Sequence, residues 1–363
     1  MELGARLRAA RLGAQLSQRA LGRKVGVTHA AISKYERGGD MPSSGVLDRL
    51  SQALGVTVDY FFRTTEVRVK PRAHRYGTRV GQKKKRAVIA AVQETLERYF
   101  DAELLCPAYV GAGNTPEAPR PWPVSSLDEV EEGASHLRQE WHLGEDPIPN
   151  MTALLEDHGI RVVEVEDLGE EFEAQLLWAN DTAPVMAVRE NATSGDRRRF
   201  SLAHELGHLV LAVSGGLDEE KAANRFAGSF LVPRAVAKRA LGERRRTLAL
   251  PELLILKQTY GLSMKAWVYR AMDLQVISRS VAGRLFRLIQ AMGYERKEPG
   301  DRYKEPGDPL PESPTRLERI VMRAYAEEAV TASRAAELLR ISLEDFRKRL
   351  KETADESAGG GGD

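Results

Sequence analysis

The fold of the central part of this chain is decided by the stretch Phe200-Ser201-Leu202-Ala203-His204-Glu205-Leu206-Gly207-His208-Leu209-Val210-Leu211. Its apolar residues recur at helical spacing and predict an amphipathic helix whose apolar face meets the core. The two histidines are four residues apart, so they share one face of the helix and can hold a single metal ion together. Glu205 lies beside the first histidine, where a carboxylate can take a proton from metal-bound water. The stretch therefore predicts a metal site with a general base.

A zinc site in a hydrolase usually has three protein ligands and one open position, so this helix needs a partner. Residues 218 to 227 form another stretch that reads as a helix. Within it Glu220 is the best third ligand, because Asn224 follows one turn later on the same face. The Asn224 amide is then placed to hydrogen-bond the free ring nitrogen of a liganding histidine. Glu219 is the alternative ligand, and the expected cofactor is Zn²⁺.

These stretches resemble the ImmA/IrrE family of metallopeptidases. The matching residues are Arg199 to His208, Glu220 to Ala227 and Phe230-Leu231-Val232-Pro233, with weaker similarity over about 145 to 275. The resemblance implies a zincin-like fold in which His204, His208 and Glu220 are the ligands. It also implies that Glu205 is the catalytic base and that the substrate is a protein, an Xre-type repressor or an antitoxin, cut in a stress or phage response. Ala222 stands where many members have a glutamate, and this departure favours Glu220 as the ligand.

The composition of the whole chain sets wider bounds. Its 363 residues are enough for two or three domains, and its net charge of +2 requires any basic surface to be local. Cys106 is the only cysteine, which favours a reducing compartment. The first residues have no apolar signal core, and no apolar run is long enough to cross a bilayer. We therefore expect a cytoplasmic protein.

Residues 1–62 predict a compact helical module with helix-turn-helix geometry. Ser17 is expected to cap a helix from Gln18 to Val25, and Gly26 is expected to end it. Thr28 is then expected to cap the next helix. Further helices are expected from residue 44 to 54 and from 58 to 62. A small bundle used only for protein contacts is the alternative interpretation.

This module resembles the Xre/Cro-like DNA-binding domains of phage repressors. The residues that carry the likeness are Leu16-Ser17-Gln18, Ala20-Leu21, Val25-Gly26-Val27-Thr28, Ile32 to Gly38, Pro42, Leu50 and Leu54-Gly55-Val56. The resemblance implies binding to an operator in double-stranded DNA, with a homodimer as one option. The residues expected at base edges are Thr28, His29, Ala30, Ser33 and Lys34. The residues expected at phosphates are Gln18, Arg19, Arg23 and Arg37.

Residues 63–123 are expected to connect the module to the metal domain. Residues 63–86 are strongly basic and predict either a solvated linker or a segment that follows the DNA backbone. Val88 to Leu105 predicts one long amphipathic helix, either a spacer, a dimer helix or a buried structural helix. Residues 107–123 are rich in proline and glycine and predict a domain boundary.

Residues 124–292 are expected to form the metallopeptidase-like domain. Asn180-Asp181 predicts the turn of a hairpin. The second strand of that hairpin is expected to lie at a sheet edge and to pair with an extended substrate. The residues expected to pair are Val185, Met186, Ala187, Val188 and Arg189. The alternative is that this strand is an ordinary part of the sheet. Tyr260 and His158 are candidates for stabilising the oxyanion by their chemistry alone.

The fold class expected for the whole chain is mainly α with a small β-sheet (α+β). A near-repeat in residues 293–315 predicts a linker, and residues 316–352 predict a C-terminal helical domain. A small packing bundle is favoured there over a second helix-turn-helix, because its third helix mixes acidic and basic residues. The function expected is a DNA-binding regulator joined to a zinc endopeptidase. The alternatives are a regulator whose metal domain is non-catalytic, or one whose metal domain senses a ligand.

Overall fold

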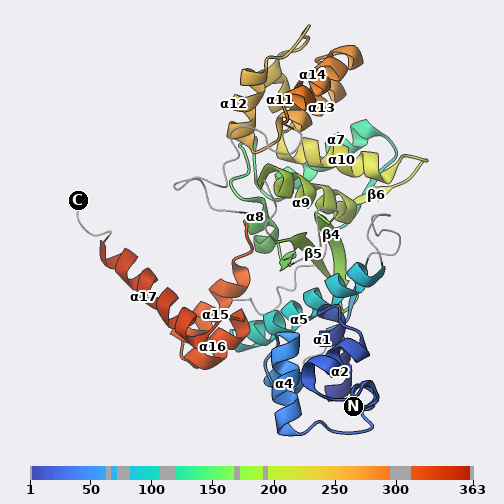
Figure 1. The fold of residues 1–363 in the computed structure, drawn as a ribbon. Helices are drawn as coiled ribbons and strands as arrows, with labels where there is room; N and C mark the ends of the chain where they lie inside the picture. Colours follow the sequence, from blue (N-terminus) through green and yellow to red (C-terminus); the bar gives the residue numbers. More distant parts are fainter. Residues whose placement is uncertain are drawn as a thin grey trace. The chain divides into compact units, whose positions relative to one another are not determined.

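The protein is described by a computed structural model that covers residues 2–62, 67–71, 82–106, 119–166, 172–190, 195–294 and 312–359. It is mainly helical with a small sheet, which confirms the expected fold class (Figure 1). The chain forms two compact units. The first contains residues 1–115, 178–181 and 315–363, and the second contains 116–177 and 182–314.

The N-terminal part of the first unit is the predicted helical module. Its elements are α1 (Glu2–Gly13), α2 (Gln18–Val25), α3 (His29–Glu36), α4 (Ser44–Leu54) and the short 3₁₀ helix η1 (Asp59–Phe62). Ser17 caps α2 by accepting a hydrogen bond from the backbone N–H of Ala20 at 3.1 Å. Gly26 ends α2 in the left-handed conformation, with φ of 71°, and Thr28 caps α3. Both helices of the motif therefore begin where the sequence predicts.

The long helix α5 (Gln82–Leu105) is a structural element of the first unit. The C-terminal helices α15 (Arg316–Ala326), α16 (Ala332–Leu339) and α17 (Leu343–Gly359) belong to the same unit. Tyr99 and Ala102 of α5 share an apolar core with residues of all three helices. On another side of α5, Arg6 of α1 pairs with Glu97 at 2.5 Å. Of the three alternatives for this helix, its contacts fit the buried structural helix, which joins the N-terminal module to the C-terminal bundle.

Helix α5 also includes the last residues of the basic stretch. Residues 83–86 lie in its first turns rather than in a linker. The first unit also contains the short strand β1 (Val69–Pro71). Parts of three predicted segments lie outside the described residues. They are residues 63–66 and 72–81 of the basic segment, 107–118 of the domain boundary and 295–311 of the later linker.

The sheet of the second unit lies beside the helix that carries the two histidines. Strand β5 (Ala183–Arg189) lies between β4 (Ala174–Ala179) and β3 (Arg161–Val165). It runs parallel to β3, with Val162 opposite Met186. The turn between β4 and β5 has Asn180 and Asp181 at positive φ, as a tight hairpin turn requires.

This order corrects one expectation. Val185 to Arg189 were expected to form a sheet edge that pairs with a substrate, but both sides of β5 are already occupied by neighbouring strands. The strand is also buried along most of its length. Its backbone therefore has no free row of hydrogen-bonding groups to offer, and β5 is ordinary central sheet.

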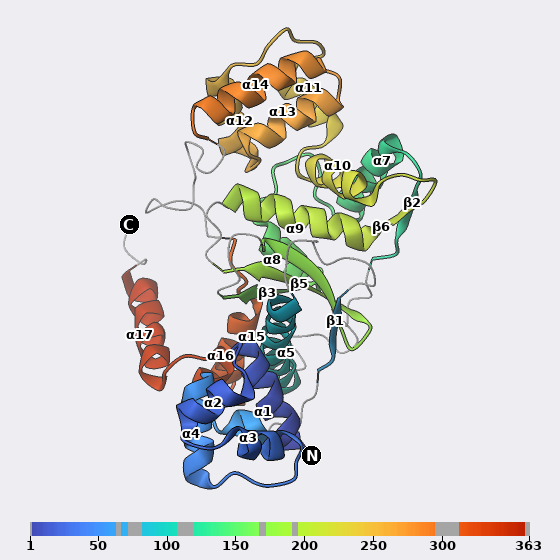
Figure 2. The same cartoon turned by 45° about the vertical axis from the view of Figure 1, so that its right-hand side comes forward.

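Helices surround the rest of the second unit. They are α7 (Leu127–Glu140), α8 (Met151–Asp157), α9 (Gly195–Val210), α10 (Glu219–Leu231), α11 (Arg234–Leu241), α12 (Leu250–Tyr260), α13 (Met264–Asp273) and α14 (Arg279–Ala291). A second small sheet pairs β2 (Trp122–Val124) in parallel with β6 (Leu211–Val213). Figure 2 shows α9 between the larger sheet and α10. This layering places α9 at the centre of the unit.

Candidate metal centre and nucleic-acid interface

The N-terminal half of α9 is held by two buried arginines. Arg199 donates through Nη2 to Oε1 of Glu312 at 2.7 Å and through Nη1 to the carbonyl oxygen of Ile148 at 2.7 Å. Glu312 also accepts from the backbone N–H of Thr152 at 2.8 Å. Arg198 donates to the carbonyl oxygen of Glu312 at 3.0 Å. These charge-assisted bonds fix the turn of α9 that precedes the first histidine.

The approach of α10 to α9 depends on Gly207. A Cβ atom placed on this glycine would lie 3.0 Å from Cδ1 of Phe226 and 3.2 Å from Cα of Ala223. A Cβ atom at these distances would require Phe226 or the backbone of α10 to shift by a few tenths of an ångström, so the glycine favours this close approach. The glycine lies between Glu205 and His208, so it brings the face of α10 that carries Glu220 within reach of both histidines.

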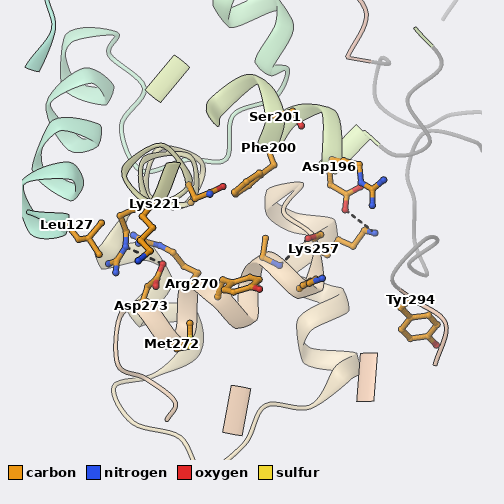
Figure 3. Close-up of a pocket in the computed structure, with 18 residues that line it drawn as sticks. Leu127, Asp196, Phe200, Ser201, Lys221, Lys257, Arg270, Met272, Asp273 and Tyr294 are labelled. Carbon is orange, nitrogen blue, oxygen red and sulfur yellow. Dashed lines mark hydrogen bonds and ion pairs between the residues drawn. The ribbon is translucent and has the colours of Figure 1, made fainter. Parts of the chain in front are cut away.

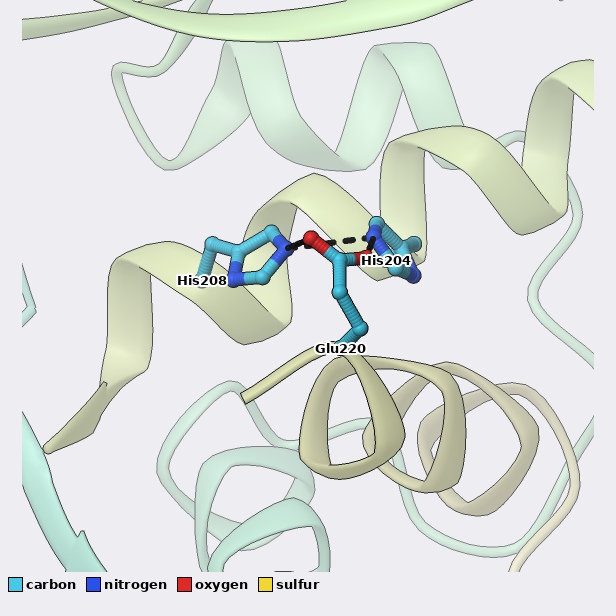
Figure 4. Close-up of side chains that lie close together, drawn as sticks. All are labelled: His204, His208 and Glu220. Carbon is cyan, nitrogen blue, oxygen red and sulfur yellow. Dashed lines mark hydrogen bonds and ion pairs between the residues drawn. The ribbon is translucent and has the colours of Figure 1, made fainter. Parts of the chain in front are cut away.

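Three side chains meet between the two helices. The Nε2 atoms of His204 and His208 are 3.1 Å apart. Glu220 places Oε2 at 3.2 Å from Nε2 of His204 and Oε1 at 3.6 Å from Nε2 of His208 (Figure 4). One donor atom of each residue can be chosen so that all three lie within 4.8 Å of one another. The structure therefore brings together the ligand set expected from the sequence.

This arrangement fits a zinc ion by the chemistry and spacing of its donors. A tetrahedral ion with ligands at about 2.0–2.1 Å separates its donor atoms by roughly 3.3 Å. The two Nε2 atoms are 3.1 Å apart, close to that value, and each lies within 3.6 Å of one of the two carboxylate oxygens of Glu220. The histidine side chains are 17% and 13% exposed, whereas that of Glu220 is 55% exposed, so the cluster opens to solvent on the α10 side.

Asn224 lies behind the first histidine. Its Oδ1 is 3.1 Å from Nδ1 of His204. An amide oxygen can only accept, so this contact selects the tautomer of His204 that carries its proton on Nδ1. The lone pair of Nε2 is then directed toward His208 and Glu220, as a metal ligand requires. Glu219, the alternative ligand, lies at the start of α10 and is not part of the cluster.

Glu205 makes a contact that the sequence did not suggest. Its Oε2 accepts a hydrogen bond of 2.8 Å from the backbone N–H of Leu176 on β4. The carboxylate is therefore oriented by β4, the first strand of the predicted hairpin. No local pattern identifies this pairing, because the two residues are 29 positions apart.

The two residues considered for the oxyanion have other neighbours. His158 stacks on Trp141, with ring centroids 3.9 Å apart, and burial lowers the pKa of its imidazole. It lies outside the histidine–glutamate cluster. Tyr260 packs edge-on against Trp267, with centroids 5.5 Å apart. Neither contact gives these side chains a role in the cluster.

The residues expected at DNA lie on and beside α3. Those that are exposed are Arg19, Arg23, Thr28, His29, Ala30, Lys34 and Arg37. Gln18 and Ser33 are partly buried. Gln18 donates to Oε2 of Glu36 at 2.8 Å, and Arg37 donates from Nε to the carbonyl oxygen of Ser33 at 3.2 Å. Gln18 therefore helps to hold α2 against α3.

Among the described helices, none combines the length and apolar character that a bilayer-spanning segment needs. Two family models match parts of the chain. A helix-turn-helix model matches residues 7–61, and a model described as the IrrE N-terminal-like domain matches residues 155–272.

Curated relatives match the N-terminal region. An HTH-type transcriptional regulator of Sinorhizobium fredii is 42% identical over 60 residues, which cover 16% of this chain and 42% of the relative. A transcriptional regulator encoded in the ATPase CF(0) region of Rhodospirillum rubrum is 41% identical over 64 residues, which cover 18% of this chain and 59% of the relative. The chain thus spans about two fifths to three fifths of the length of these relatives.

Among solved structures, Bacillus thuringiensis PlcR in complex with the peptide PapR7 and DNA aligns over 99% of both chains, at 10% identity and a TM-score of 0.19. A score this low carries no structural argument. The two family models agree with the geometry of the regions that they match. The chain carries an Xre-like helix-turn-helix domain at its N-terminus and an IrrE N-terminal-like domain of the ImmA/IrrE metallopeptidase type over residues 155–272.

Proposed function

We propose that this protein is a DNA-binding transcriptional regulator whose IrrE N-terminal-like domain is a zinc-dependent endopeptidase. The observation that carries the peptidase part is the convergence of His204, His208 and Glu220 between α9 and α10. Asn224 supports it by holding the tautomer of His204 that a metal ligand needs.

The DNA-binding part rests on the helix-turn-helix domain and on its exposed α3 face. Curated relatives that match this region are named as transcriptional regulators. In such a domain the N-terminal residues of the second motif helix read base edges in the major groove. We assign that role to Thr28, His29, Ala30, Ser33 and Lys34. Arg19 and Arg37 contact phosphates, and Gln18 positions α2 beneath them.

The peptidase chemistry follows from the donor set. When bound, a zinc ion supplies Lewis-acid activation of a water molecule and of the scissile carbonyl. Glu220 and the two histidines would hold the ion, and Asn224 orients the ring of His204. Glu205 accepts the proton of the attacking water and delivers it to the leaving amine. The hydrogen bond from Leu176 fixes one carboxylate oxygen of Glu205 for this transfer.

The substrate class proposed is a small Xre-type repressor or an antitoxin. Cleavage of such a protein would link the peptidase to the same kind of operator that the N-terminal domain recognises. The compartment proposed is the cytoplasm, where both DNA and such repressors are found, and the response proposed is one to stress or phage.

The experiment is to express the wild type and Glu205→Gln beside the small Xre-type repressors of the host cell and to follow those repressors by mass spectrometry. The substitution keeps side-chain volume but removes the base, which costs about two to four orders of magnitude in rate. Cleavage by the wild type alone supports the peptidase. If neither protein cuts any repressor and both regulate equally, the peptidase assignment fails.

A second candidate is a regulator whose metal domain does not cleave. The observation that favours it is that Glu205 is already hydrogen-bonded to the backbone of β4. In that case the carboxylate serves to tie α9 to the sheet. Glu205→Ala, which removes the acceptor for Leu176, would then lower stability, whereas Glu205→Gln keeps an oxygen that can accept this bond and would leave regulation unchanged, which separates the two candidates.

A further inference from the structure

The second unit contains a large pocket, whose lining residues are drawn in Figure 3. Its volume is about 680 Å³, which is within the range of sites that take a small organic molecule. It lies along α9 and α10 and is closed by α12 and α13. A single amino-acid side chain is far smaller than this space, so the pocket is suited to a whole small molecule.

The pocket lies next to the cluster of His204, His208 and Glu220. Phe200 and Ser201 line it, and they lie one turn before His204 on the same face of α9. Asn224 also lines it, and its Oδ1 contacts His204. An occupant of the pocket therefore touches the residue that orients a proposed metal ligand.

The charge of the lining is positive. Its basic residues are Arg197, Lys221, Arg225, Lys257, Lys265 and Arg270, and its acidic residues are Asp196 and Asp273. Two carboxylates outside the lining reduce this excess. Glu131 pairs with Arg225 and Arg270, and Glu173 lies 3.5 Å from Arg197. Among the described residues, six basic side chains of the lining face the two acidic ones and these two neighbouring carboxylates, so the described part of the pocket favours an anion.

Apolar surface accompanies this charge. The ring of Tyr269 lines the pocket and packs against Phe286, with centroids 4.6 Å apart. Phe200, Met272 and Tyr294 add further apolar area. Tyr269 is 47% exposed although it is one of the larger rings of the unit. A half-exposed aromatic ring beside basic groups is typical of a surface that binds a ligand.

Buried ion pairs and hydrogen bonds connect the walls of the pocket. At one end, Glu131 accepts from Nη2 of Arg270 at 2.8 Å and from Oγ of Ser229 at 2.9 Å. At the other end, Nζ of Lys257 lies 3.2 Å from Oδ2 of Asp196, and both side chains are buried. These pairs give the buried charges of the walls their partners and hold the side chains of the walls in place.

From these observations we infer that the pocket is a binding site for a small organic anion, a molecule with one acidic group and an aromatic or aliphatic body. The acidic group lies among the exposed basic side chains, and the body lies against Tyr269 and Phe200. This inference does not depend on peptidase activity. Binding of this molecule would be a chemical signal to the regulator, because the molecule would contact Asn224, which contacts His204.

Gly228 provides a sharp test, because it lines the pocket on α10. A Cβ atom added there would lie 3.6 Å from Cδ of Arg270, which is ordinary van der Waals contact. The backbone therefore accepts a side chain at this position, and a longer side chain fills the pocket. Gly228→Leu is the variant that blocks the site, and Gly228→Ala is its matched control.

The probe is anilinonaphthalene sulfonate, an anionic aromatic dye, titrated by fluorescence into the full chain. Its uncharged analogue phenylnaphthylamine is titrated in parallel. We expect one saturable site for the anionic dye in the wild type and in Gly228→Ala, and a loss of about tenfold or more in affinity in Gly228→Leu. Tyr269→Ala is expected to weaken both dyes. It serves as the second variant if Gly228→Leu does not fold, as judged by circular dichroism.

Charge reversal tests the anion part. Lys265→Glu, in the pocket lining, is compared with Arg287→Glu, which is exposed on α14 and does not line the pocket. We expect Lys265→Glu to weaken the anionic dye and not the neutral one, and Arg287→Glu to change neither. Equal affinity for the anionic dye in the wild type, Gly228→Leu and Tyr269→Ala would overturn the site. If Lys265→Glu changes the affinity for the two dyes equally, the proposed preference of the pocket for anions is overturned.

Discussion

Gly207 of α9 faces Ala223 of α10 so closely that a Cβ atom on the glycine would lie 3.2 Å from Cα of Ala223. The contact is between backbones, so a longer side chain cannot be accommodated by rotation alone. Since His208 follows Gly207 and Glu220 precedes Ala223, the distance between the two helices also sets the distance between the proposed ligands.

The first prediction concerns this contact. Gly207→Ala is expected to push α10 away, to lower the free energy of unfolding by about 1–3 kcal/mol and to weaken zinc binding. Gly228→Ala on α10 is the control, since its Cβ atom meets nothing closer than 3.6 Å. Denaturant unfolding and zinc titration with a chelating dye measure both effects. An unchanged stability in Gly207→Ala would contradict the packing described here.

The second prediction concerns the orientation of His204. Asn224→Ala removes the acceptor for Nδ1 and is expected to weaken zinc binding by about 10–100-fold without unfolding the protein. Lys221→Ala is the control, because this exposed residue lies on the same helix and is not a member of the histidine–glutamate cluster. Zinc affinity is measured by competition with a chelator. Equal affinities of the two variants would remove the role given to Asn224.

The third prediction concerns the buried carboxylate of Glu131. Burial alone would raise its pKa, but hydrogen bonds and the charge of Arg270, with bonds from Ser229 and Arg225, hold that pKa below its ordinary value. A depressed pKa stabilises the fold at pH values above the unfolded value near 4.3, and this stability is lost as pH falls through the folded pKa. The free energy of unfolding of the wild type, measured from denaturant curves, should therefore decrease below about pH 4.

Glu131→Gln is expected to be less stable than the wild type at neutral pH by about 3–5 kcal/mol, because it leaves guanidinium groups buried without a counter-charge. The difference between the two proteins should shrink as pH falls. A difference that stays constant from neutral to acid pH would show that the charge of Glu131 does not contribute.

The fourth prediction concerns DNA. In the full chain, Lys34→Ala is expected to weaken binding to all duplexes. It should also reduce the dependence of the logarithm of affinity on the logarithm of salt concentration by about one released counterion. His29→Ala is expected to change the preference between sites instead. Arg347→Ala, on the exposed surface of α17, is the control and should change neither. Gel shifts over a salt series test this, and an effect of Arg347→Ala as large as that of Lys34→Ala would assign DNA binding to the C-terminal helices too.

The parts of this protein that sequence predicts are those fixed by short-range rules. Ser17 and Thr28 cap their helices because a side-chain oxygen can reach a backbone N–H three residues later, and that spacing is visible in the sequence. The histidine pair and Asn224 follow from helical periodicity in the same way. The proposed ligand set could therefore be assembled from two short stretches.

What sequence missed depends on long-range pairing. Whether β5 lies at an edge or in the centre of the sheet is decided by β3 and β4, and its own residues do not reveal which. Glu312 follows a stretch of sequence rich in proline and glycine, yet it is buried because Arg199 of α9 reaches it. The pocket is formed by residues from several helices, and no single stretch carries its pattern.

The most direct test of the account is the metal content of the full chain and of two neighbouring variants, measured by mass spectrometry after purification without added chelator. The wild type and Glu219→Ala are expected to carry about one zinc ion per chain, while Glu220→Ala is expected to carry almost none. His204→Ala should lose the ion as Glu220→Ala does. Full occupancy in Glu220→Ala, or no metal in the wild type, would contradict the assignment of His204, His208 and Glu220 as one metal centre.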